Sequence, residues 1–131
     1  MVIYDLEYSK GFRVLHKSGM WRTAMHSYDR NVNGIEALQE WGIHEDSEEA
    51  FVLLCGDGVL AVQSDTGKTQ IIPMQPLQQY VVGVAELHAI ALKEGARVLI
   101  MENADMSRFQ TLPMRKEVRD AVRIALDCKK F

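Results

Sequence analysis

Three residues of the chain carry side chains that are typical ligands of a divalent metal ion. His44 precedes Glu49 by five residues, and His88 lies in a later apolar segment. Alternation along the strand that begins at Glu49 places Phe51 on the same face. A glutamate that points into an apolar interior is costly unless a cation or a hydrogen-bond donor meets it. Two imidazoles and one carboxylate form a ligand set used by non-haem iron and by other divalent metals.

Each of these three residues also has a simpler interpretation. His44 can be a solvated loop histidine whose acidic neighbours favour its protonated form, which disfavours metal binding. Glu49 can share a solvated strand start with Glu48, and His88 can bond to a neighbour or contact a ligand without any metal. Metal binding and metal-free ligand binding therefore both stay open, and no residue is assigned a catalytic role.

Four further residues are candidates for binding a substrate: Trp41, Arg22, His26 and Tyr80. Alternation over residues 21–28 puts Arg22 and His26 on one face. An inward Arg22 would favour an anionic substrate through a bidentate contact, but the more frequent arrangement is a solvent-exposed face. Trp41 and Tyr80 are plausible pocket walls, although aromatic residues at strand spacing more often belong to the core.

The elements that must position these residues are short strands between about residues 10 and 103. Apolar runs such as 50–55 end in turn residues, and residues 64–68 form a hairpin signal ahead of the strand 69–73. At least eight such strands indicate a sandwich or a barrel. From about residue 113 to 130 the apolar spacing becomes helical. We expect this C-terminal α-helix to pack on the outside of the barrel or across a dimer partner.

Two segments resemble the motifs of the cupin superfamily. In residues 42–58, Glu49 and Gly56 keep the six-residue gap of the first cupin motif, and His44 stands where its second histidine lies. Gly42 falls at the position of the first histidine. In the second segment, His88 matches the motif histidine, while the usual Pro and Gly before it are replaced by Gly83 and Ala85. The resemblance implies an all-β, RmlC-like jelly roll (a double-stranded β-helix) that comprises residues 1–131 as one domain.

The same resemblance implies function classes. Cupins include metal-dependent isomerases, epimerases, dioxygenases and decarboxylases that act on sugars or small acids, and many are homodimers. It implies one divalent ion (Fe, Mn, Zn or Ni, which the sequence does not distinguish) held by His44, Glu49 and His88. The replaced motif residues favour an alternative, a metal-free module that binds or senses a metabolite. A structural dimer without catalysis is a third possibility.

Composition narrows the partners of the chain. It has 131 residues, a net charge of −3 and two cysteines. Phosphate binding needs a concentrated basic face, so we expect no nucleic-acid partner. No apolar run approaches the ~20 residues needed to span a bilayer, and residues 1–5 do not resemble a signal peptide. Few cysteines in a domain of this size favour a reducing compartment, and we expect a cytoplasmic protein that binds a small molecule.

Overall fold

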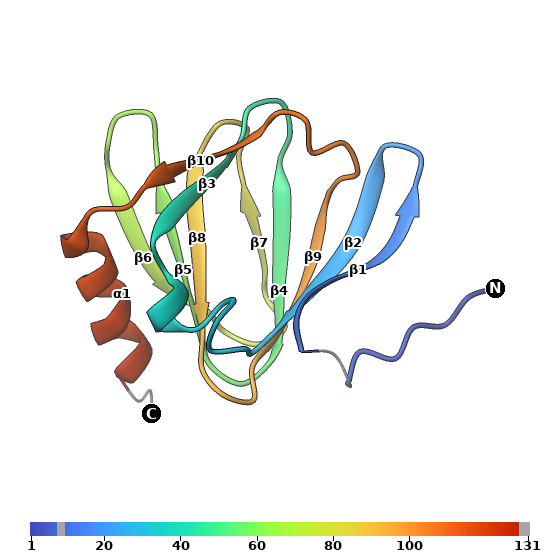
Figure 1. The fold of residues 1–131 in the computed structure, drawn as a ribbon, viewed down its shortest axis with the longest axis horizontal. Helices are drawn as coiled ribbons and strands as arrows, with labels where there is room; N and C mark the ends of the chain where they lie inside the picture. Colours follow the sequence, from blue (N-terminus) through green and yellow to red (C-terminus); the bar gives the residue numbers. More distant parts are fainter. Residues whose placement is uncertain (8–9, 129–131) are drawn as a thin grey trace.

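A computed structural model describes residues 1–7 and 10–128 of the chain. Two five-stranded antiparallel sheets face each other, in the orders β1-β2-β9-β4-β7 and β10-β3-β8-β5-β6 (Figure 1). The strands are β1 (Gly11–Ser18), β2 (Trp21–Ser27), β3 (Glu40–His44), β4 (Glu49–Cys55), β5 (Gly58–Gln63), β6 (Thr69–Pro73), β7 (Gln79–Val82), β8 (Leu87–Leu92), β9 (Arg97–Asn103) and β10 (Phe109–Pro113). The predicted all-β class is confirmed.

The inner faces of the two sheets form the main core. Period-2 alternation explains it, because every second side chain of a strand points inward. In β4, Phe51 and Leu53 are buried on the same face as Glu49. In β9, Val98 and Ile100 are buried on the same face as Glu102. Glu49 begins β4 and Glu102 lies near the end of β9, and these two strands are antiparallel neighbours. Both strands therefore place an acidic side chain of the inner face at the same end of the core.

The α-helix α1 (Lys116–Asp127) covers the outer face of the second sheet (Figure 1). Its buried residues Val122 and Leu126 belong to a second apolar cluster with Val59, Ala61 and Ala91 of β5 and β8. The expected packing outside the barrel is thus observed. Among the described residues, no helix has the length and apolar character that crossing a membrane requires.

The C-terminal segment differs from the sequence prediction at its start. The sequence places residues 109–112 between the last predicted strand and the predicted helix, and residue 113 at the start of that helix. In the structure, residues 109–113 form the strand β10, which pairs with β3 at one edge of the second sheet. The helix then begins at Lys116. The predicted helix end at residues 129–130 lies outside the described residues.

The turn before His88 contains a strained alanine. Ala85 has a φ of 61°, and its N–H donates to the carbonyl of His44 at 2.9 Å. Residues with a Cβ are disfavoured in the left-handed region of backbone conformation, and Asn and Asp tolerate it better than alanine does. We expect Ala85→Gly to raise the free energy of unfolding by about 0.5–1 kcal/mol, because the relieved strain outweighs the greater entropy of the unfolded glycine. Chemical denaturation measures this difference.

A second loop alanine provides the control for that measurement. The N–H of Ala104 also donates to a backbone carbonyl, that of Met20 at 2.9 Å, but Ala104 does not have a positive φ. Ala104→Gly should therefore lower the stability. Equal losses in both variants would contradict the strain at Ala85.

Candidate metal centre and its cavity

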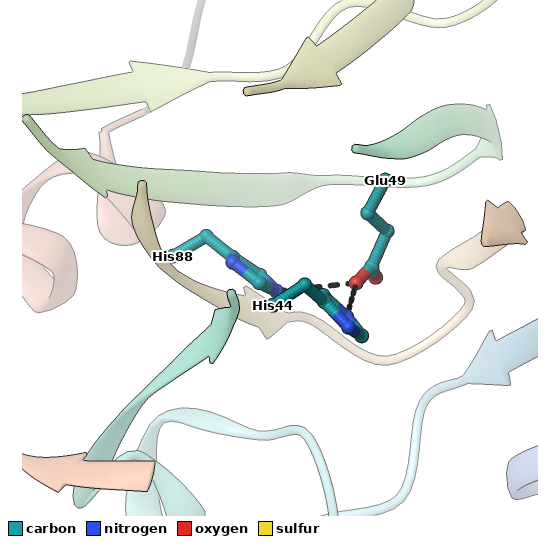
Figure 2. A group of neighbouring side chains, drawn as sticks. All are labelled: His44, Glu49 and His88. Carbon is teal, nitrogen blue, oxygen red and sulfur yellow. Dashed lines mark hydrogen bonds and ion pairs between the residues drawn. The ribbon is translucent and has the colours of Figure 1, made fainter. Parts of the chain in front are cut away.

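His44, Glu49 and His88, here called the triad, converge at one end of the core (Figure 2). Glu49 Oε1 lies 2.5 Å from His44 Nε2 and 3.2 Å from His88 Nε2. The two imidazole rings are nearly parallel, with centroids 5.5 Å apart and an interplanar angle of 9°. All three side chains are buried. The structure thus brings together the three residues that the sequence singled out as metal ligands, while metal binding itself stays a prediction.

Strand register explains the convergence. Gly42 of β3 pairs with His88 of β8, so that His44 follows two residues later on the same face. Glu49 is the first residue of β4 in the facing sheet, where it pairs with Val82 of β7. The backbone bond from Ala85 to the carbonyl of His44 ties the end of β3 to the turn that leads into β8. The two imidazoles therefore reach the carboxylate from the facing sheet.

The donor set fits a divalent metal ion. One ligand atom from each of His44, Glu49 and His88 lies within 4.8 Å of the other two. Two imidazole nitrogens and one carboxylate oxygen suit Fe, Mn, Zn or Ni, and a buried position limits competition from water. Nitrogen must be unprotonated to bind a metal, so an ion would replace the hydrogen bonds that Glu49 receives.

The triad is electrostatically linked to a fourth buried group, Glu102 of β9. Burial alone would raise the pKa of Glu49, but its hydrogen bonds with His44 and His88 hold that pKa well below its usual range. Burial would lower the pKa of His44, yet the hydrogen bond and charge of Glu49 raise it. Burial and the nearby Glu49 charge raise the pKa of Glu102, against the opposing effect of Arg22. The site therefore holds two carboxylates that a cation would stabilise.

Arg22 forms a buried ion pair with Glu102. Its Nε and Nη2 lie 2.7 and 2.6 Å from Glu102 Oε2, and the other carboxylate oxygen lies 3.6 Å from His44 Nε2. From the sequence, a solvent-exposed face that carries Arg22 and His26 is the more frequent arrangement. This expectation is wrong for Arg22, because its side chain is only 10% exposed. Glu102 neutralises this guanidinium, so Arg22 does not offer an unpaired positive charge to an anionic ligand.

A cavity of about 420 Å³ opens onto the triad. Arg22, His26, Asn33 and Glu102 contribute polar groups to its lining. The apolar residues of its lining include Phe12, Leu38, Trp41, Phe51, Ile100 and Phe109, of which Leu38 and Trp41 also belong to the second apolar cluster under α1. Of the four predicted substrate-binding residues, Trp41, Arg22 and His26 line this cavity. Tyr80 does not, because its hydroxyl accepts from the N–H of Gln75 and donates to Gln78, each at 2.8 Å.

Phe109 occupies the space next to Gly42. A Cβ added at Gly42 would lie 3.0 Å from two ring carbons of Phe109 and 3.6 Å from His88 Nε2. The same ring packs against His44, with centroids 4.9 Å apart. A side chain at position 42 would therefore point toward the triad, and β10 fills that place with an aromatic ring instead. Phe109 is not among the predicted site residues, because residues 109–112 lie between the last predicted strand and the predicted helix and carry no motif.

His26 predicts a pH dependence of stability. Burial lowers its pKa from 6.5 to about 4, although the charge of Glu49 opposes the shift. As the pH falls below 6.5, the unfolded chain takes up a proton at His26 that the folded protein does not. The contribution of neutral His26 to the free energy of unfolding is thus fully present above pH 6.5. It is lost as the pH falls toward 4, which lowers the free energy of unfolding by roughly 3 kcal/mol. Urea unfolding of wild type and His26→Gln between pH 7 and 4 should give a steeper decline for wild type, and parallel declines would contradict it.

Comparison with known proteins identifies the fold. No protein-family model matches the chain, and no curated protein matches its sequence. Solved structures do match. The cupin domain of Schizosaccharomyces pombe Cnp3 has a TM-score of 0.59 and 14% identity, over 80% of this chain and 70% of that one. An RmlC-like cupin from Desulfovibrio desulfuricans has a TM-score of 0.55 and 18% identity, over 79% and 96%.

A Bacillus subtilis oxalate decarboxylase variant also matches, with a TM-score of 0.58 and 14% identity. The match covers 90% of this chain but only 34% of the enzyme. At these identities the comparisons concern the fold, and they show that the chain has the cupin jelly-roll fold with a C-terminal helix. The resemblance in fold that the sequence motifs predict is confirmed, and His44, Glu49 and His88 form a group that could hold a metal ion.

Proposed function

We propose that this protein binds a small polar molecule, such as a sugar or a small acid, in the barrel cavity, beside a divalent metal ion held by His44, Glu49 and His88. The observation that carries the proposal is the convergence of these three ligand atoms within 4.8 Å of one another at the cavity wall. Three separate strands supply them, so the cluster depends on the tertiary fold and not on sequence proximity.

The cavity supports a ligand of modest size. Its volume of about 420 Å³ lies toward the lower end of the ~300–1,000 Å³ usual for small-molecule sites. Apolar walls and a few convergent polar groups are typical of such sites, because the walls exclude water and the polar groups set the orientation. Phe51 and Phe109 provide such walls on opposite sheets.

The triad and its neighbours would have separate roles. His44, Glu49 and His88 would hold the ion, which would supply Lewis-acid polarisation of a ligand oxygen. The Arg22–Glu102 pair borders the triad and keeps a second carboxylate 3.6 Å from His44 Nε2. Because this pair is internally neutral, it would orient the polar end of a ligand without selecting for its net charge.

A specific observation also favours a metal-free binding module as the second candidate. Glu49 is already paired with both imidazoles, so its buried charge has partners without a cation. Phe109 also fills the space where a further ligand at position 42 would lie. In that case the cavity would hold its ligand through hydrogen bonds and aromatic walls alone.

Metal content and thermal stability separate the two candidates. Protein purified without chelator and then stripped should gain stability on addition of Mn²⁺ or Zn²⁺, by about 2.7 kcal/mol at 100 times the dissociation constant. His88→Ala and Glu49→Gln should lose this gain because each removes a ligand. His16→Ala is the control, since His16 bonds to Tyr4 at an exposed site away from the cavity. No gain in wild type, or an equal gain in all four proteins, would overturn the metal proposal.

A further inference from the structure

A hydrogen-bonded chain runs from a turn to the cavity wall. The N–H of Asp29 donates to Asn33 Oδ1 at 2.8 Å. Asn33 Nδ2 lies 2.8 Å from the carbonyl oxygen of Ser27 and 3.1 Å from His26 Nδ1. Asn33 is only 2% exposed, so these contacts are made away from bulk water. The chain ends on an imidazole that lines the cavity.

Two of these contacts fix the orientation of the Asn33 amide. A backbone N–H can only donate and a backbone carbonyl can only accept. The oxygen of Asn33 must therefore face Asp29, and its NH₂ group must face Ser27. The opposite orientation would set two donors against each other at Asp29 and two acceptors against each other at Ser27.

The fixed amide in turn fixes the tautomer of His26. The second hydrogen of the Asn33 NH₂ group points at His26 Nδ1, which must accept it and is therefore unprotonated. The single ring proton of a neutral His26 then resides on Nε2. Burial favours this neutral form, since it lowers the pKa of His26 to about 4. Within residues 1–7 and 10–128, no hydrogen bond to Nε2 is formed, so this N–H is available in the cavity.

We propose that His26 is a specificity-determining residue whose Nε2–H donates to an oxygen acceptor of the bound ligand. This inference rests on the proposed function in one respect, that the cavity takes a small molecule. The donor is uncharged and held in one tautomer by Asn33, and the Phe12 ring packs beside it with centroids 5.0 Å apart. The site would thus favour ligands that present a carbonyl, carboxylate or hydroxyl oxygen at this point, and disfavour those that present only an amine.

The tautomer is tested without any ligand or metal. Two-bond ¹H–¹⁵N correlation spectra of protein labelled with ¹⁵N-histidine distinguish a protonated ring nitrogen from an unprotonated one. We expect His26 to show protonated Nε2 and unprotonated Nδ1 from pH 5 to 8. A protonated Nδ1, or a doubly protonated ring at neutral pH, would overturn the inference whatever the metal experiment shows.

The ligand contact is tested with glycolate and the Zn²⁺-supplemented protein. His26→Phe keeps a ring but removes the donor, and should weaken glycolate binding about 3- to 10-fold, the value of one net hydrogen bond. His26→Gln restores an N–H near the Nε2 position and should bind within about twofold of wild type. His16→Phe controls for loss of an exposed histidine. Equal dissociation constants for His26→Phe and His26→Gln, measured by calorimetry, would overturn the proposed contact.

Failure of this contact and failure of the metal site give different results. Without a metal site, wild type gains no stability from Zn²⁺ while the tautomer of His26 stays as expected. Without the His26 contact, Zn²⁺ still stabilises wild type and the two His26 variants bind glycolate alike.

Discussion

Replacing Arg22 with methionine is expected to lower the free energy of unfolding by about 3–5 kcal/mol, because it leaves the buried carboxylate of Glu102 without its partner. Both Nε and Nη2 of Arg22 contact one oxygen of Glu102, and the carboxylate is only 4% exposed. The Glu49 charge also acts on Glu102, so the unpaired carboxylate would face a like charge as well as desolvation. Urea unfolding at pH 7.5 measures the loss.

A double-mutant cycle separates the ion pair from the loss of packing. The variant Arg22→Met with Glu102→Leu removes both charges and should recover most of the stability, because apolar replacements of a buried pair are often neutral. Arg13→Met is the matched control: Arg13 also lies in the first sheet, but it is exposed, and among residues 1–7 and 10–128 its side chain bonds to the carbonyl of Asp5. Its effect should stay within about 0.5 kcal/mol. A loss of equal size for Arg22→Met and for the double variant would contradict a destabilising unpaired charge.

Local periodicity predicts the parts of the site that lie on alternating apolar strands. Glu49 shares a face with Phe51, and this alternation alone indicates that its carboxylate points inward, as the fold confirms. The same alternation in β9, through Val98 and Ile100, also points to an inward Glu102. Here the signal is present in the sequence, but the cupin motifs do not include this position. A buried acid at the end of an apolar strand face is therefore informative without a motif.

Other parts of the site depend on contacts that no local pattern encodes. Phe109 reaches Gly42 and His44 because β10 pairs with β3, and the register partners Phe109 and His44 are 65 positions apart in the chain (109 − 44). Asn33 acts through a turn whose backbone N–H and carbonyl groups become its partners only once the chain has folded. Tyr80 illustrates the reverse case: strand spacing makes it a plausible wall, but its hydroxyl turns to the loop at Gln75 and Gln78.

The space shared by Gly42 and Phe109 supports the second prediction of large effect. Metal sites with four protein ligands bind Zn²⁺ with apparent free energies of about 10–16 kcal/mol, or roughly 2.5–4 kcal/mol for each ligand. A side chain at position 42 would start 3.6 Å from His88 Nε2 and point toward the triad. We therefore expect Gly42→His combined with Phe109→Ala to tighten Zn²⁺ binding by about 100-fold or more, measured by competition with a chelator.

The single variants show whether Phe109 controls access to that position. In Gly42→His alone, the new side chain meets ring carbons 3.0 Å from its Cβ, so it must displace Phe109 or turn away from the triad, and the gain should be much smaller. In Phe109→Ala alone, the donor set is unchanged and the affinity should stay within about threefold of wild type. If the double variant bound Zn²⁺ no better than Phe109→Ala, position 42 would not face the ion, and the triad would have to bind it from another side. A gain confined to the double variant would mean that an aromatic ring from β10, rather than the absence of a histidine alone, sets the coordination number of this site.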